Sequence, residues 1–135
     1  MTMTSTPSHK EARVWFAEQL RHWGNALLFN PTDVQSDLHA LESAFPDAAW
    51  YAAALDETSR QLSVIAGRRP GTDMHGRLLG WRRDAFQSAP KLRGSKADLR
   101  IVYRMLPDGQ LELFGFGHRH QPESVYRRLS ARPVP

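Results

Sequence analysis

The feature that most constrains the fold of this chain is a β-hairpin pattern close to its C-terminus. Apolar residues occupy alternate positions from 99 to 105, which is the period of a strand with one buried face (Leu99, Ile101, Tyr103 and Met105). A second alternating run covers 111–117, and Asp108-Gly109 between the two runs is a strong signal for a tight turn. The pattern predicts two adjacent antiparallel strands, whose apolar face the other elements must cover.

Apolar residues spaced three and four positions apart predict three helices before the hairpin, over residues 8–23, 30–45 and 47–67. The first opens on a capping box, in which Glu11 follows Ser8 by three positions. Asn30, with a proline directly after it, is a suitable N-cap for the second.

The predicted order of elements is a helix, a short strand at 26–29, two helices and three antiparallel strands, the first of them within 77–87. This order predicts an α+β fold: a small antiparallel sheet of three to four strands packs on two helices, with an added N-terminal helix. We assign residues 1–24 to an N-terminal helical extension and 25–135 to the main unit of one compact domain.

Length and cysteine content set further limits. A chain of 135 residues is long enough for one domain with a real core, and without cysteine it has neither disulfides nor thiolate metal ligands. A reducing compartment fits this composition best. The N-terminus lacks the charged-then-apolar pattern of a secretion signal, and no apolar run approaches the ~20 residues of a membrane span. We therefore expect a cytoplasmic protein with no membrane partner.

Charge is distributed unevenly along the chain. Up to residue 66 there are four lysines and arginines against eight acidic residues, a net charge of −4. From residue 67 onward there are fourteen against six, a net charge of +8. A basic C-terminal half favours a polyanionic partner, nucleic acid first, although a solvated basic face without a partner has the same composition.

A cluster of ionisable residues follows the second hairpin strand. His118, Arg119 and His120 come directly after it, Tyr126 lies a few residues further on, and Arg100 of the first strand can reach the same end of the sheet. Arginines, imidazoles and a phenol in one place are the groups that a site for a phosphodiester needs.

Each of these residues also has a purely structural interpretation. Arg100 and Arg104 can be solvated strand residues or partners of Glu112 across the hairpin. The two imidazoles can simply face solvent. Their spacing is typical of metal ligands, but no third ligand of the usual type lies nearby in the sequence, so we expect no metal site.

The segment KADLRIVYRMLPDGQLELFGFGHRHQPESVYRRL (96–129) resembles the C-terminal half of the RelE/ParE toxin superfamily. In that superfamily a strand reading "yRivYrv" precedes a hairpin, a hydrophobic strand and "GhR…vYr". The likeness continues upstream. ALLFNPTDVQSDLHAL (26–41) is similar to the family's first strand and first helix, residues 47–66 to its second helix, and HGRLLGWRRDAF (75–86) to the approach to its second strand. The likeness covers about residues 25–130.

The resemblance implies a small toxin that arrests growth and is held silent by a cognate antitoxin. The RelE-like branch cleaves messenger RNA, commonly in the ribosomal A site, without a metal or other cofactor. The ribose 2′-OH attacks the adjacent phosphate and the 5′-oxygen leaves. By their positions in the motifs, Arg100 and Arg119 would bind the phosphate, and Tyr126 would stack on or orient a base.

The chain departs from this pattern where RelE carries lysines on the second strand, because arginines stand there and a guanidinium does not deprotonate at usable pH. His118 and His120 are therefore the preferred acid and base, since imidazole titrates near neutrality. There is also one more residue between Arg119 and Tyr126 than in a relative from that superfamily. The remaining basic residues are predicted to contact RNA (Arg82, Arg83, Lys91, Arg93, Lys96, Arg104, Arg127 and Arg128).

Two other functions stay open at this point. A ParE-like toxin inhibits DNA gyrase by binding it and cuts nothing, and the paired imidazoles argue against this alternative. A catalytically inactive RelE-like binding module is the other, and the absence of the second-strand lysine favours it. The N-terminal helix is a possible homodimer contact.

Overall fold

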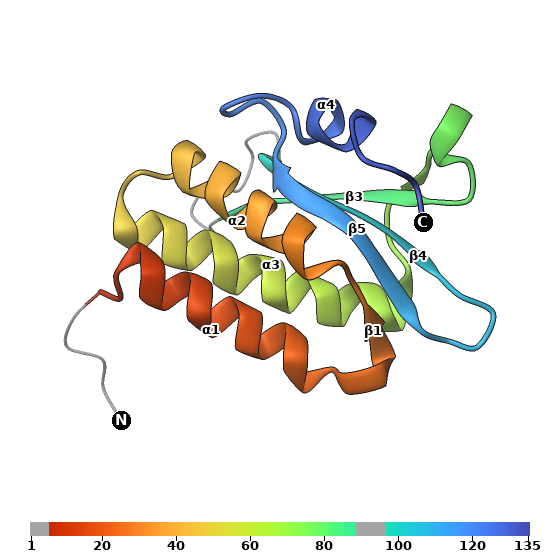
Figure 1. The fold of residues 1–135 in the computed structure, drawn as a ribbon, viewed down its shortest axis with the longest axis horizontal. Helices are drawn as coiled ribbons and strands as arrows, with labels where there is room; N and C mark the ends of the chain where they lie inside the picture. Colours follow the sequence, from red (N-terminus) through yellow and green to blue (C-terminus); the bar gives the residue numbers. More distant parts are fainter. Residues whose placement is uncertain (1–5, 89–96) are drawn as a thin grey trace.

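The computed structural model describes residues 6–88 and 97–135, which form an α+β fold (Figure 1). One mixed sheet lies between a layer of long helices on one face and the short C-terminal helix α4 (Val125–Ser130) on the other. The element order from the first strand onward is strand, two helices and then further strands, which confirms the predicted α+β class.

The three long helices begin where the sequence places their caps. They are α1 (His9–His22), α2 (Pro31–Ala44) and α3 (Ala48–Arg68). Ser8 and Glu11 form the capping box of α1. The side chains of Asn30 and Asp47 accept hydrogen bonds from the first backbone N–H groups of α2 and α3. Each cap satisfies donors that a helix cannot satisfy internally, so these local signals fix the helix starts.

The sheet contains five strands in the order β1-β5-β4-β3-β2. They are β1 (Leu27–Leu28), β2 (Thr72–Asp73), β3 (Arg82–Phe86), β4 (Leu99–Met105) and β5 (Leu111–His118). Strand β1 runs parallel to β5, and the remaining pairs are antiparallel. The prediction of a purely antiparallel sheet of three to four strands is therefore wrong on both points. The strand expected within 77–87 begins at Arg82, because a 3-10 turn over Gly76–Leu78 precedes it.

The helix-facing side of the sheet carries the main core. Alternate residues of β4 are buried against the long helices, as the hairpin pattern predicts, whereas on β5 a register shift breaks the predicted alternation and places Phe116 on the same face as Leu111 and Leu113. Helix α1 belongs to this core: Phe16 is fully buried, and its ring centroid lies 5.2 Å from that of Phe116 on β5. The N-terminal helix therefore shares its core with the rest of the chain.

The other face carries a smaller core, in which Trp81, Val102 and Phe114 pack against Val125 and Leu129 of α4. A register shift between Val102 and the next residue places an extra β5 residue opposite this point. Helix α4 and the sheet are thus joined by apolar contacts, and Arg128 of α4 adds a hydrogen bond to the carbonyl of Phe116 on β5.

Beyond its short pairing with β1, the outer edge of β5 is capped by side chains. The N–H of Phe116 donates to Asp37 of α2 at 3.2 Å, and its carbonyl accepts from Arg128 at 2.9 Å. The carbonyl of Phe114 accepts from Arg132 at 3.0 Å. Both arginines also bind Asp37, so an Arg–Asp–Arg cluster satisfies backbone groups that a neighbouring strand would otherwise bind.

Glycine at 115 makes this edge cluster possible. A Cβ there would lie 2.4 Å from a methyl carbon of Leu129 and 2.9 Å from Nη1 of Arg132. Helix α4 and the chain after it could not approach β5 as closely with any larger residue at this position.

Candidate functional site

A polar cleft of about 490 Å³ opens on the α4 side of the sheet. Its walls come from β3, β4, α4 and the segment that enters β2 (Gly71, Thr72, Arg83, Asp84, Ala85, Arg100 and Tyr126). Ala85 of β3 pairs with Arg100 of β4, so Arg83, two residues before Ala85, projects from the same face as Arg100. The structure thus brings together three residues of the predicted site: Arg83, Arg100 and Tyr126.

Arg100 is anchored at one end of its guanidinium. Its Nη1 donates to the carbonyl of Ala97 at 2.8 Å and to that of Leu99 at 2.9 Å. Its Nε and Nη2 make no hydrogen bond to the residues that the structure describes. A half-buried guanidinium held on one side, with donors left on the other, suits the binding of an anion.

Arg83 and Tyr126 contact each other across the cleft. The Cζ of Arg83, an exposed residue, lies 5.8 Å from the centroid of the Tyr126 ring, within cation–π range. The Tyr126 hydroxyl is buried and has no hydrogen-bond partner among residues 6–88 and 97–135. The cleft therefore combines two cations with an aromatic ring.

The segment before β2 forms the opposite wall and depends on a glycine. Gly71 has φ +105°, and a Cβ on it would lie 2.0 Å from the carbonyl oxygen of Arg83. Gly71 and Thr72 are residues of the cleft that the sequence does not predict. No local signal marks them, because their place in the cleft depends on the pairing of Thr72 with Arg83 in the folded sheet.

Asp84 also lines the cleft, although its carboxylate hydrogen-bonds Gln61 of α3 on the helix side of the sheet. Burial raises the pKa of Asp84, and the hydrogen bond from Gln61 and the charge of Arg100 oppose the shift. Burial thus disfavours the negative charge of the one carboxyl that lines the cleft.

His118 projects from the opposite face to Arg100. It pairs with Leu99, a residue of the helix-facing core, whereas Arg100 pairs with Gly117. The imidazole packs against the edge of the Phe45 ring on the α2 side, with centroids 6.0 Å apart. His118 is therefore not among the residues that line the cleft.

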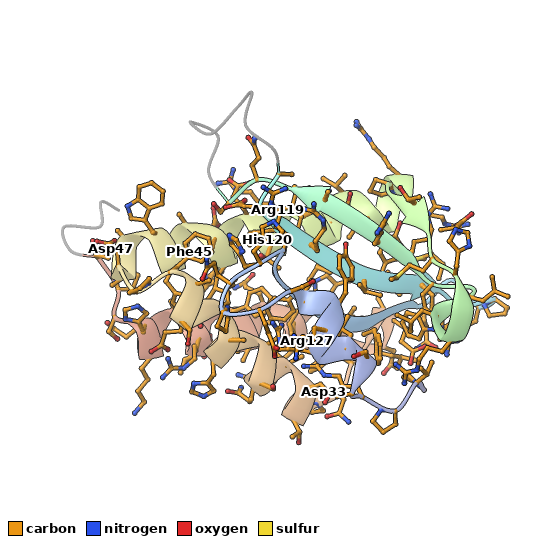
Figure 2. The ribbon with its side chains drawn as sticks, turned by 90° about the horizontal axis from the view of Figure 1, so that it is seen from above. Asp33, Phe45, Asp47, Arg119, His120 and Arg127 are labelled. Atoms are coloured by element: carbon orange, nitrogen blue, oxygen red, sulfur yellow. The ribbon has the colours of Figure 1, made fainter. Side chains whose placement is uncertain are left out.

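Arg119 and His120 directly follow β5, and Arg127 lies apart from them on α4 (Figure 2). The N–H of Arg119 donates to the carbonyl of Asp98 at 2.9 Å, which extends the β4–β5 pairing by one residue. His120 is exposed, and its ring centroid lies 6.4 Å from that of His118. Neither Arg119 nor His120 lines the cleft.

Several other arginines predicted to contact RNA are engaged in internal contacts. Arg82 donates to Asp73 at 2.6 Å and to the carbonyl of Gly71 at 2.7 Å. Arg104 binds Glu112 at 2.7 Å and lies 4.4 Å from the Trp81 ring centroid.

The two consecutive arginines of α4 differ sharply. The Arg128 side chain is only 12% exposed and binds Asp37 and Phe116, whereas that of Arg127 is 81% exposed beside Glu123. Lys91, Arg93 and Lys96, also predicted to contact RNA, lie outside the described residues.

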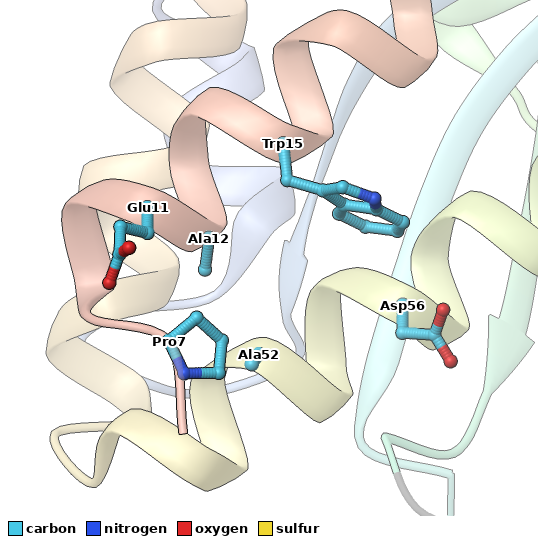
Figure 3. A pocket seen from close by; sticks show the side chains of 6 residues that line it. All are labelled: Pro7, Glu11, Ala12, Trp15, Ala52 and Asp56. Carbon is cyan, nitrogen blue, oxygen red and sulfur yellow. The ribbon is translucent and has the colours of Figure 1, made fainter. Parts of the chain in front are cut away.

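A second hollow, of about 370 Å³, lies between α1 and α3 (Figure 3). Trp15 forms one wall, and Pro7, Ala12 and Ala52 add apolar surface. The two acidic residues at this hollow already have partners: Glu11 in the capping box and Asp56 in an ion pair with Arg60. None of the described residues that line the hollow is basic, so this lining does not fit an anionic ligand.

Comparison of the chain with family models, with curated proteins and with solved structures finds no match in any of the three. In the described part of the chain, no three histidine, cysteine, aspartate or glutamate side chains are placed to hold a metal ion. No helix of that part is both long and apolar enough to cross a membrane.

Proposed function

We propose that this chain is a RelE-like endoribonuclease toxin, which binds messenger RNA in the cleft between β3, β4 and α4 and is held silent by a cognate antitoxin. The convergence of Arg83, Arg100 and Tyr126 in that cleft is the observation that carries the proposal. Two guanidinium groups on one face can bind a phosphate, and a base can stack on the aromatic ring beside them.

The proposed reaction needs no metal. The 2′-oxygen of a ribose attacks the adjacent phosphorus, the bond from phosphorus to the 5′-oxygen breaks, and the products are a 2′,3′-cyclic phosphate and a free 5′-hydroxyl. One proton leaves the 2′-hydroxyl and another reaches the 5′-oxygen. Arg83 and Arg100 would stabilise the charge that develops on the phosphate oxygens, and this is the step to which fixed cations contribute most.

For proton transfer we propose His120, with Arg119 as an additional phosphate contact. His120 is exposed, and an imidazole can both accept and donate a proton. It lies outside the cleft lining, so RNA would have to extend from the cleft past the end of β5 to reach it. Messenger RNA on the ribosome is the substrate that the family resemblance predicts.

A non-cleaving binding module is the second candidate, and one observation favours it. Neither His118 nor His120 lines the cleft that holds the arginines. A protein that only binds RNA requires the cleft and no proton transfer, so this candidate predicts binding without new RNA ends.

Incubating the purified chain with single-stranded RNA in excess EDTA, and with ribosomes carrying messenger RNA, tests the proposal. We expect new 5′-hydroxyl ends in at least one of the two mixtures, and a rate lower by about 100-fold or more in Arg83→Ala and Arg100→Ala. Arg60→Ala is the matched control, since Arg60 is exposed on α3 and, among the residues that the structure describes, forms an ion pair only with Asp56 one turn before it.

The outcomes separate the candidates. RNA that binds but stays intact in both mixtures supports the binding module. Cleavage that survives in the Arg83→Ala/Arg100→Ala double variant removes the cleft from the mechanism. Inhibition of DNA gyrase without any effect on RNA supports the ParE-like alternative.

A further inference from the structure

The imidazole of His118 organises the turn that follows β5. Its Nδ1 accepts a hydrogen bond from the backbone N–H of His120 and another from that of Gln121, both at 2.9 Å. These are contacts to the second and third residues after it. Asparagine and aspartate side chains make the same kind of contact in Asx turns, so His118 acts here as the oxygen of an asparagine would.

Two donors directed at one nitrogen fix the protonation of the ring. Nδ1 can accept hydrogen bonds only while it carries no proton, so the neutral imidazole must carry its proton on Nε2. We propose that His118 is a positioning residue: a neutral Nε2–H imidazole that locks the turn over 119–121, and whose protonation at Nδ1 releases that turn.

The surroundings of His118 favour the locked form. Burial lowers the pKa of His118, and the charges of His120, Arg119 and Arg100 act in the same direction. The carboxylate of Asp98 opposes them, although that carboxylate already accepts hydrogen bonds from the N–H and the hydroxyl of Ser88. From the α2 side the ring meets the uncharged edge of Phe45.

The hydrogen bonds of His118 to the turn also bear on cleavage, and this consequence, unlike the turn itself, rests on the proposed function. A nitrogen that holds two N–H groups is not free to take a proton from a ribose hydroxyl, so His118 does not act as the general base. Its effect on cleavage instead comes through Arg119 and His120, the residues of the turn. Cleavage should therefore fall at acidic pH as His118 takes up a proton, even when RNA is still bound.

The tautomer and the pH response are measured by NMR on the uniformly ¹⁵N-labelled chain without RNA. We expect an Nε2–H tautomer for His118 in two-bond ¹⁵N–¹H spectra at pH 7.5. On acidification, the amide signals of His120 and Gln121 should shift together with the midpoint of the His118 titration, below pH 6.5. An Nδ1–H tautomer, or amide signals that do not follow that midpoint, would overturn the proposal.

Two variants separate the lock from simple packing. In His118→Asn the amide oxygen takes the place of Nδ1 and does not titrate, so the turn should stay protected from amide exchange from pH 8 to pH 5. In His118→Phe the ring against Phe45 remains but the acceptor is lost, so the two amides should lose protection at every pH. Equal protection in the two variants would contradict the lock.

The same variants distinguish this inference from the proposed nuclease activity. If the wild type cleaves RNA, cleavage by His118→Asn should lack the decline at acidic pH that depends on His118, and cleavage by His118→Phe should be slower at every pH. If the amides of the turn respond to pH and to the variants as expected but the chain does not cleave RNA, the role of His118 in the turn stands and the nuclease proposal is refuted. A loss of most activity at pH 7.5 in His118→Asn would refute the positioning role.

Discussion

Asp37→Ala should destabilise the fold more than any surface substitution, because Asp37 neutralises two buried guanidinium groups. Its side chain is 1% exposed, and those of Arg128 and Arg132 are 12% and 9% exposed. The carboxylate accepts bonds from Arg128 at 3.0 Å, from Arg132 at 2.5 and 3.2 Å, and from the N–H of Phe116 at 3.2 Å. Alanine would remove the carboxylate that the two guanidinium groups share, leave them mainly carbonyl acceptors, and deprive the N–H of Phe116 of its acceptor in a place that water reaches poorly.

The expected loss is about 3–5 kcal/mol, the cost of breaking a buried ion pair by removing one partner. Each lost hydrogen bond to a charged group contributes about 1.5–3 kcal/mol to stability, so the sum of these contributions is larger than this loss. The full sum is not lost, because the arginines can turn partly toward solvent in the variant. A domain of this size is stable by about 5–15 kcal/mol, so the variant should remain folded in most of that range. With a urea m-value of about 2 kcal/mol/M, the midpoint should fall by about 2 M.

Equilibrium urea denaturation followed by circular dichroism measures the change, with Arg127→Ala as the matched control. Arg127 is exposed and, within residues 6–88 and 97–135, forms an ion pair only with Glu123 one turn before it, so its loss should change stability by no more than about 0.5 kcal/mol. If Asp37→Ala costs less than about 1 kcal/mol at an unchanged m-value, the cluster does not hold the edge of β5 as described.

Three further predictions concern the core, the cleft and pH. Phe16→Ala should lower the free energy of unfolding by about 3–5 kcal/mol, and Val14→Ala on the exposed side of α1 by no more than about 0.5 kcal/mol, in the same urea assay. Tyr126→Phe should leave the free energy of unfolding unchanged or raise it by up to about 1 kcal/mol, because the hydroxyl that it removes is buried without a partner in the described structure. Filter-binding assays should show that the RNA affinity of this variant is unchanged. Burial lowers the pKa of His118 in the folded chain, so between that pKa and pH 6.5 the unfolded chain binds more protons than the folded chain. The free energy of unfolding should therefore fall as the pH decreases through this range. Urea titrations at different pH should show that His118→Asn abolishes this part of the decrease.

The parts of the fold that the sequence predicts correctly are those that depend on local contacts. Each long helix starts at a cap residue a few positions from the donors that it satisfies. The alternation in 99–105 places the helix-facing side chains correctly because a strand has a period of two wherever it lies. The same reasoning places Arg83 and Ala85 on one face of β3, which is the face that forms the cleft.

The features that the sequence does not predict depend on residues far apart in the chain. Asp37 looks like an ordinary exposed acid of an amphipathic helix, and its partners Arg128 and Arg132 follow 91 and 95 residues later. Strand β1 contains two residues, and its partner in parallel pairing, β5, begins more than 80 residues later and also contacts α2. No local pattern contains this information, because it is created when the layers come together.

The same distinction decides how much of the basic charge is free for a polyanion. Many arginines of the C-terminal half hold the fold together: Arg77 donates to three carbonyls at the end of α4, and others engage acidic side chains (Arg82, Arg104, Arg128 and Arg132). A net charge of +8 therefore overstates the attraction for RNA, because electrostatic binding follows the cations that can reach phosphate.

In the described part of the chain, Arg83, Arg100 and Arg119 lie on or beside the cleft. The salt dependence of RNA binding should reflect that small set, with a slope lowered by about 0.7 for each of the three that is removed. The full count of lysines and arginines would predict a much steeper dependence, so measuring this slope tests whether the cleft, rather than the whole basic half, is the RNA-binding surface.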